Sequence, residues 1–224
     1  MLGSALLLTL ASSAQAVPYS QVKVDGFNLV VETSLIEKRK ETWTAVKTEL
    51  HRQFLGIKRV IPMPALQKLQ KVSIYVHDKS PHTQCMAYHP GAQWLREHKM
   101  NPDMASHVEI GNADNFLSWT HQQPWMVLHE FAHAYHDRFL PEGFGNPELK
   151  DVHQRALDSK KYDAVLHWNG STSGHYAKNN PMEFFAEATE AYFGQNDFFP
   201  FVRGELQTHD PETFALIAKL WRQE

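Results

Sequence analysis

The sequence predicts an α+β protein in which a small sheet lobe comes first and a helical lobe follows. Alternation of apolar and polar residues, the pattern of strands, occurs in the first half of the chain. Longer segments with helical spacing, bounded by prolines and glycines, fill the second half. Strands followed by helices are typical of the α+β class, and no linker-like composition separates the halves. We therefore predict one domain with a small mixed sheet, helices, and a cleft between two lobes.

The first half holds the strand signals and one helix signal. The pair Asp25-Gly26 is a hairpin-type turn inside an apolar stretch, and Val72, Ile74 and Val76 alternate with other residues. Another segment spaces its apolar residues as a helix does, with charged residues between them. We expect strands within residues 22–31, 71–77 and 106–113, a helix at residues 36–55, and loops over most of residues 78–106.

Prolines and glycines bound the helices expected in the second half. Proline fits the first helical turn because it lacks an N–H group that would have no partner there. Glycine or proline beyond the last turn stops a helix. These signals predict helices at residues 124–140, 147–160, 181–194 and 211–221.

The composition is that of a soluble globular protein. The chain has 224 residues, a formal net charge of −3, 42% hydrophobic residues and 21% charged residues. A nearly neutral chain has no electrostatic attraction for nucleic acid or an anionic membrane, so neither is expected as a partner. The one cysteine, Cys85, cannot form an intramolecular disulfide, and we expect a small buried residue rather than a nucleophile.

The first sixteen residues resemble a secretory signal peptide. Residues 1–16 carry no charge, contain a short apolar run, and end in the small-x-small pattern Ala14-Gln15-Ala16. The run is too short to span a bilayer, so no stable membrane insertion is expected. Cleavage after Ala16 would export residues 17–224 as a secreted or periplasmic protein. No basic residue precedes the run, and a buried N-terminal helix or a misassigned start is the alternative.

The strongest chemical signal is the motif His129-Glu130-x-x-His133 in the segment WMVLHEFAHAYHDRF, residues 125–139. Four residues make just over one helical turn, so both imidazoles project from one face and can bind one Zn²⁺ ion. Glu130 lies on the adjacent flank, where it can take a proton from an attacking water molecule. The neighbouring apolar residues predict burial, and burying these three polar side chains unpaired would be costly. A metal ion would satisfy all three.

A catalytic zinc ion needs a third protein ligand, and the segment NNPMEFFAEATEAYF, residues 179–193, contains the candidates. Glu183 and Glu187 are one turn apart on one helix face, where they would repel each other without a nearby cation. In one interpretation Glu183 is the ligand and Glu187 accepts the second N–H of a ligand histidine. In the other, Glu183 forms a capping box with Asn180 and Glu187 is the ligand.

Of the remaining polar residues in and near the two helices, three are expected to face solvent and two are candidate hydrogen-bond donors. His136 and Asp137 end the first helix, and Glu190 is the third acid of the second; we expect all three to face solvent. Hydrolysis also needs a donor for the negative charge that develops on the attacked carbonyl oxygen. Tyr176, or its neighbour His175, precedes the second helix and is placed to supply it.

Together, HEFAH and YAKNNPMEFFAEA resemble the catalytic domain of the anthrax lethal factor group of zinc metallopeptidases, within the gluzincins. In that group a tyrosine stands seven residues before the glutamate ligand, as Tyr176 stands before Glu183. The resemblance covers about residues 125–194, and Ala132 replaces the glycine often found between the family's histidines. It implies a zincin-like fold with the active-site helix between the lobes, zinc ligands His129, His133 and Glu183, general base Glu130, oxyanion donor Tyr176, and Glu187 as the partner of a ligand histidine.

The same resemblance implies a role for SHVEIGNA, residues 106–113. In zincins a strand at the sheet edge beside the cleft pairs with an extended peptide substrate through main-chain hydrogen bonds. Val108, Glu109 and Ile110 are therefore the candidate substrate-binding residues. An ordinary edge strand with no such role is the alternative.

The sequence thus predicts an exported zinc metallopeptidase, most simply an endopeptidase, that hydrolyses peptide bonds in a peptide or protein substrate. One alternative is a zinc-binding protein without catalytic activity, which the presence of Glu130 disfavours because a structural zinc site has four closed protein ligands. Another is a zinc hydrolase of a non-peptide amide, which the motif alone does not exclude.

Overall fold

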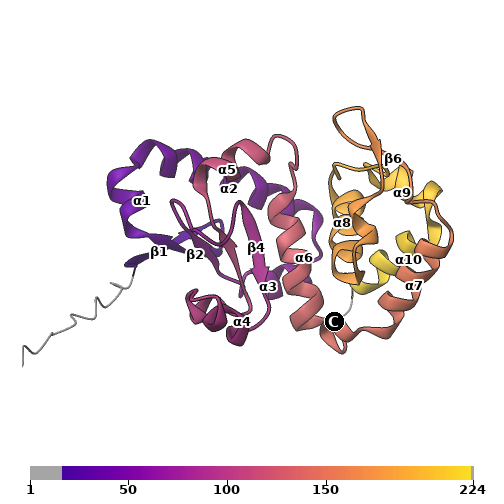
Figure 1. Ribbon diagram of the computed structural model, residues 1–224, viewed down its shortest axis with the longest axis horizontal. Coiled ribbons are helices and arrows are strands. Elements are labelled where there is room, and N and C mark those ends of the chain that lie inside the picture. The colour runs from indigo at the N-terminus through magenta and orange to yellow at the C-terminus, as the bar shows by residue number, and fades with distance from the viewer. Residues whose placement is uncertain (1–16, 223–224) are drawn as a thin grey trace, which may run out of the picture.

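The computed structural model describes residues 17–222 and has the α+β architecture that the sequence predicts. Figure 1 shows the sheet lobe at one end of the molecule and the later helices at the other, with α6 (Met126–Phe139) between them. The expected signal peptide, residues 1–16, lies outside the described residues. Within residues 17–222, no helix is long and apolar enough to cross a membrane.

A five-stranded mixed sheet is the framework of the first lobe. Its strands are β1 (Tyr19–Val24), β2 (Phe27–Glu32), β3 (Ile74–Val76), β4 (Met86–His89) and β5 (His107–Ile110). Their order across the sheet is β1-β2-β3-β5-β4. β2, β3 and β5 run parallel, whereas β1 and β4 run antiparallel to their neighbours at the two edges. The hairpin between β1 and β2 turns at Asp25 and Gly26, which have φ angles of 52° and 96°.

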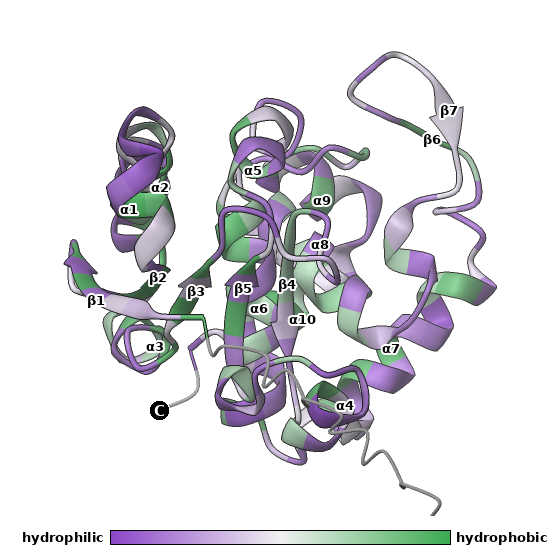
Figure 2. Cartoon of the chain, turned by 60° about the vertical axis from the view of Figure 1, so that its left-hand side comes forward, coloured by the Kyte–Doolittle hydropathy of each residue, from purple (hydrophilic) through white to green (hydrophobic). Residues whose placement is uncertain are grey.

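Helices cover both faces of this sheet. They are α1 (Thr33–Lys38), α2 (Lys40–Val60), α3 (Met63–Leu69), α4 (Ala92–Glu97) and α5 (Ala113–Trp119), with a short 3₁₀ turn η1 (Pro102–Met104). On one face, Phe27 stacks on Phe54 of α2 and on Phe131 of α6, at 4.2 and 5.3 Å between ring centroids. On the other face, Val30 and Tyr75 pack with Leu95 of α4. Figure 2 shows the central strands β3 and β5 as the hydrophobic ones, with paler strands at the edges.

The second lobe packs its helices against the far side of α6. It contains α7 (Pro147–Asp158), α8 (Pro181–Phe193), α9 (Arg203–His209) and α10 (Pro211–Leu220), the hairpin β6 (Val165–Leu166) and β7 (Thr172–Ser173), and the 3₁₀ turns η2 (Gly143–Gly145) and η3 (Tyr176–Lys178). α8 lies along α6. Trp221 stacks on Tyr135 of α6 and Phe185 of α8, at 4.2 and 5.8 Å. One hydrophobic core therefore runs through both lobes, with α6 as their shared wall.

The sequence predicts the long helices and four of the strands of the five-stranded sheet, and it misses several other short elements. The expected strands and the four expected C-terminal helices are confirmed within a few residues of their ends. Cys85 is buried, also as expected, and its Sγ lies 3.5 Å from Met126 Sδ. The prediction of loops over residues 78–106 is wrong, because β4, α4 and η1 lie there. β4, α4 and η1 have only three to six residues each, and unlike residues 71–77 they lie in a segment without a longer alternating or helical pattern.

Candidate metal centre

α6 holds its two motif histidines on one face because its remaining surface is packed in the core. Val127, Leu128 and Phe131 are fully buried, so the polar residues of the helix share the one direction left open. The ring centroids of His129 and His133 lie 4.8 Å apart, with the planes at 78°. No side chain caps the start of the helix, but the Val127 N–H donates to Gln53 Oε1 of α2 at 3.0 Å. This bond anchors the first turn of α6 to the sheet lobe.

α8 brings the third candidate ligand to the same point. Asn180 caps the helix by accepting the Glu183 N–H at 2.9 Å, and Pro181 occupies the first turn, as the sequence predicts. The carboxylate of Glu183 then reaches across to α6. Its Oε2 lies 3.1 Å from His129 Nε2 and 3.4 Å from His133 Nε2. Of the two interpretations open from the sequence, the geometry therefore favours Glu183 as the residue that faces both histidines.

The three side chains fit one zinc ion. Bonds of about 2.0–2.2 Å in a tetrahedral arrangement place ligand atoms about 3.3 Å from each other. The two Glu183–histidine separations lie close to that value, and all three ligand atoms lie within 4.8 Å of one another. Two imidazoles and a carboxylate are a donor set of catalytic zinc sites, which leave a fourth position open.

Hydrogen bonds between the histidines and the carboxylates shift the pKa values in this cluster. Burial alone would lower the pKa of His129, but hydrogen bonds to Glu183 and Glu190 raise it well above its ordinary value. Burial would likewise raise the pKa of Glu183, yet the hydrogen bonds from His129 and His133 hold it well below its usual range. The carboxylates therefore favour a positive charge on His129, and a divalent cation bound at Nε2 would take the place of that charge.

Three carboxylates of α8 face α6, one more than the sequence predicts. Glu190 is only 2% exposed, so the expectation that it faces solvent is wrong. Positions i, i+4 and i+7 share one helix face, which places Glu183, Glu187 and Glu190 in a row. Glu190 Oε1 accepts a hydrogen bond from His129 Nδ1 at 2.6 Å, whereas Glu187 Oε1 lies 3.6 Å from that nitrogen. The i+7 spacing was the signal in the sequence that could have identified Glu190.

Glu130 and Tyr176 meet the histidines in a cavity of about 350 Å³ between the lobes. Glu130 is 9% exposed and Tyr176 is 46% exposed, so the tyrosine stands at the opening. Tyr176 begins η3, which the buried His175 stabilises by accepting the Ala177 N–H at 3.1 Å. Burial and the nearby charge of Glu183 raise the pKa of Tyr176, which keeps its hydroxyl protonated. His175 stacks on Phe198 and does not line this cavity, so of the two candidate donors only Tyr176 reaches it.

The strand beside the cavity is β4, and the prediction that β5 is this strand is wrong. β5 is paired on both sides, and Val108, Glu109 and Ile110 are fully buried. The residues that line the cavity on this side are Met86, Ala87 and Tyr88 of β4 and the preceding Cys85. Cys85 O accepts the Gly111 N–H at 2.7 Å, so alternate residues along β4 bond to β5. The backbone groups of Met86 and Tyr88 consequently point away from the sheet, towards the open edge.

Glu109 forms hydrogen bonds inside the sheet lobe and does not line the cavity. Its Oε2 accepts hydrogen bonds from His89 Nε2 at 2.8 Å and Thr83 Oγ1 at 2.5 Å. His77 Nε2 of the β3 side lies 3.4 Å from its Oε1. Burial would raise the pKa of Glu109, but the hydrogen bonds from His89 and Thr83 lower it. Glu109 therefore ties β4 and the loop before it to the middle of the sheet.

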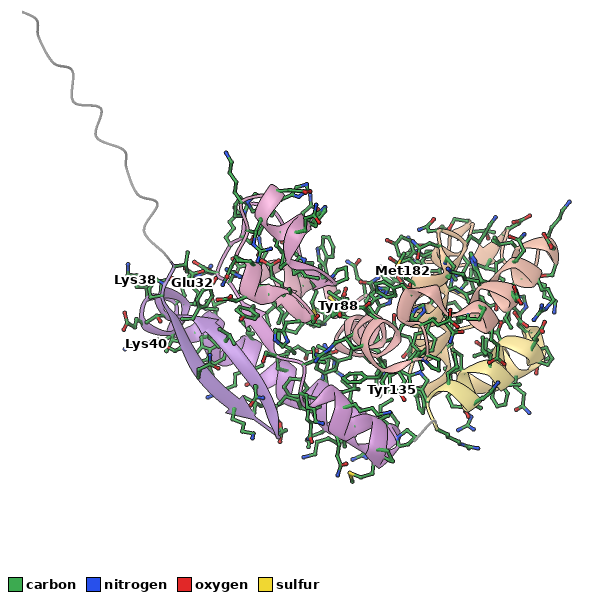
Figure 3. The ribbon with its side chains drawn as sticks, turned by 90° about the horizontal axis from the view of Figure 1, so that it is seen from below. Glu32, Lys38, Lys40, Tyr88, Tyr135 and Met182 are labelled. Carbon is green, nitrogen blue, oxygen red and sulfur yellow. The ribbon has the colours of Figure 1, made fainter. Side chains whose placement is uncertain are left out.

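The two polar residues at the end of α6 are also part of the fold. His136 is fully buried and contacts the rings of Phe144 and Phe185, so the expectation that it is solvated is wrong. Burial lowers its pKa to about 4. Asp137 accepts the Tyr88 hydroxyl at 2.6 Å, and Figure 3 shows Tyr88 beside α6. This bond joins the edge strand to the helix that carries the histidines.

No protein-family model matches the chain, and no curated protein matches it. The solved structure of the Pro-Pro endopeptidase of Paenibacillus alvei is similar, with a TM-score of 0.43 and 22% sequence identity over 81% of this chain and 90% of that chain. The resemblance to the anthrax lethal factor group stays a prediction.

Proposed function

We propose that residues 17–224 form a single zincin-like domain of an exported zinc metallopeptidase. The observation that supports this most is the convergence of His129 Nε2, His133 Nε2 and Glu183 Oε2 in a cavity that Glu130 and Tyr176 also line. The candidate ligands come from two helices that are distant in the sequence, α6 at the boundary between the lobes and α8 in the second lobe.

The proposed mechanism divides the work among the residues of the cavity. A zinc ion held by His129, His133 and Glu183 would polarise the scissile carbonyl and acidify water. Glu130 takes the proton of the attacking water and passes it to the leaving amine. The Tyr176 hydroxyl donates to the carbonyl oxygen as negative charge develops there. A tyrosine with a raised pKa suits this role, since it stays protonated at neutral pH.

The substrate we propose is an extended polypeptide segment bound along β4. The outward N–H and C=O groups of Met86 and Tyr88 are the unpaired edge of the sheet, which an extended chain can complete as an added strand. The hydrogen bond from Tyr88 to Asp137 fixes this edge relative to α6 and therefore relative to the histidines. The free edge favours a peptide over a non-peptide amide, and the open cavity favours a catalytic zinc site over a closed structural one.

A metal analysis combined with a cleavage assay tests the proposal. The protein should bind about one equivalent of zinc and degrade an unfolded protein such as casein, and a chelator should abolish the cleavage. Glu130→Gln should keep its zinc and lose the activity. Glu148→Gln is the matched control, because Glu148 is an exposed acid paired with Lys219 and lies outside the cavity. Normal cleavage by Glu130→Gln, or cleavage that survives zinc removal, would contradict the proposed mechanism.

A further inference from the structure

The Nδ1 atom of His129 faces two carboxylates of α8 but makes its hydrogen bond to only one. Glu190 Oε1 lies 2.6 Å from Nδ1, a short charge-assisted hydrogen bond. Glu187 Oε1 lies 3.6 Å from the same nitrogen, beyond hydrogen-bond distance. Glu187, the acid one turn after Glu183, therefore makes no hydrogen bond to the imidazole of His129.

Glu187 has a different set of partners. Its Oε2 accepts a hydrogen bond from Asn196 Nδ2 at 2.9 Å, and the same amide nitrogen donates to the Glu187 carbonyl at 2.8 Å. Asn196 is 1% exposed, and it lies just beyond the end of α8. These bonds turn the Glu187 carboxylate towards the end of α8, so its role is to secure the segment that follows the helix.

The group formed by His129, Glu187 and Glu190 is not a second metal site. Its ligand atoms lie within 4.8 Å of one another. Two ligands of one zinc ion, with bonds of about 2.0–2.2 Å, lie about 3 Å or more apart. The 2.6 Å between His129 Nδ1 and Glu190 Oε1 is shorter than that and is the length of a hydrogen bond.

We propose that Glu190, and not Glu187, is the positioning residue for the zinc ligand His129; this inference rests on the proposed zinc centre. The hydrogen bond keeps the proton on Nδ1 and so directs the lone pair of Nε2 towards Glu183 and His133. The negative charge of Glu190 also makes the ring a stronger donor to a metal ion. Glu183 and Glu190, two turns apart on α8, therefore act on opposite nitrogens of one imidazole.

The burial of Glu190 supports a role at the metal centre. The residue is 2% exposed, and within residues 17–222 its second oxygen, Oε2, has no hydrogen-bond partner. A buried carboxylate with half its acceptors unpaired is costly for a fold. A divalent cation on the other nitrogen of the same ring offsets that cost. If the side chain at this position served packing alone, an apolar residue would fill the space without the cost of burying a carboxylate.

Two matched variants distinguish the role of Glu190 in zinc binding from that of Glu187. Glu190→Gln and Glu187→Gln make the same change on the same buried helix face. The zinc dissociation constant is measured for each full-length variant by competition with a chromophoric chelator. We expect Glu190→Gln to weaken zinc binding about tenfold to a hundredfold, and Glu187→Gln to weaken it clearly less. An equal or greater loss in Glu187→Gln, or unchanged binding in Glu190→Gln, overturns the inference.

The tautomer of His129 gives a readout that a packing role would not change. In zinc-loaded wild-type protein with ¹⁵N-labelled histidine, the Nδ1 proton of His129 should resonate far downfield and show a nuclear Overhauser contact to the side chain of Glu190. A contact to Glu187 instead overturns the inference, and this measurement needs no variant to fold. Wild-type protein that binds no zinc overturns the proposed function itself, whereas zinc-binding protein with the wrong contact overturns only the role of Glu190.

Discussion

The free edge of β4 can be tested by removing one backbone donor. Met86→Pro removes the backbone N–H of residue 86, which points away from the sheet. The backbone hydrogen bonds between β4 and β5 come from Cys85 and Ala87, so the substitution leaves them in place. Met86 is also the first residue of the strand, a position that tolerates proline. The substitution should therefore remove a contact with the substrate and leave the sheet intact.

The size of the effect follows from the bond that is lost. One backbone hydrogen bond contributes about 0.5–1.5 kcal/mol net, which corresponds to about 2- to 13-fold in kcat/KM. The ring also occupies the space in which the substrate carbonyl would sit, so the upper end of that range applies. We expect kcat/KM for an extended peptide to fall about tenfold, with the zinc content unchanged.

Steady-state cleavage of a fluorogenic peptide measures this change, and Met86→Ala is its control. Met86→Ala shortens the side chain that lines the cavity but keeps the N–H, so it should reduce kcat/KM less than the proline does. Ala87→Pro should instead destabilise the protein, because Ala87 pairs with Glu109 in the ladder. If Met86→Pro folds normally and cleaves as well as Met86→Ala, substrate does not bind along β4.

Three further predictions concern the donor, the buried histidine and the packing beside α6. Tyr176→Phe should lower kcat about a hundredfold to a thousandfold with zinc still bound, because it removes the oxyanion donor; an unchanged kcat would exclude Tyr176 from the mechanism. His136 has a folded pKa of about 4, below its ordinary 6.5, so the unfolded chain takes up a proton that the folded chain excludes as the pH falls below 6.5. Its contribution should lower the free energy of unfolding by about 2 kcal/mol between pH 8 and pH 5; urea titrations measure this, and the same pH dependence in His136→Phe would contradict it. Gly194→Ala would place a methyl carbon 2.2 Å from Cε2 of Trp125, so it should destabilise the fold by about 1–3 kcal/mol in thermal unfolding, whereas Gly204→Ala, in open space, should not.

The residues that the sequence identifies best are those whose chemistry depends on local spacing. His129 and His133 share a face because four residues close one helical turn, and the structure places them accordingly. The helix start at Asn180 and Pro181 is likewise a local signal, and it sets the direction in which Glu183 projects. The structure then brings these residues together, which the spacing alone could not show.

The features that the sequence does not reveal depend on contacts between distant segments. Nothing local distinguishes β5 from β4 as the edge strand, because strand order is decided by pairing across the sheet. Glu190 and His136 are residue types that are usually exposed on a helix, yet in this fold each is covered by another helix or loop. The i+7 spacing places Glu190 on the same helix face as Glu183, but only the packing of α8 and η2 on α6 shows that Glu190 and His136 are buried.

The metal centre itself can be tested most directly by diffraction at the zinc absorption edge from crystals of the zinc-loaded protein. We expect one anomalous peak, about 2.0–2.2 Å from His129 Nε2, His133 Nε2 and Glu183 Oε2. A peak at Glu187 in place of Glu183, or no peak between the two histidines, would contradict the account.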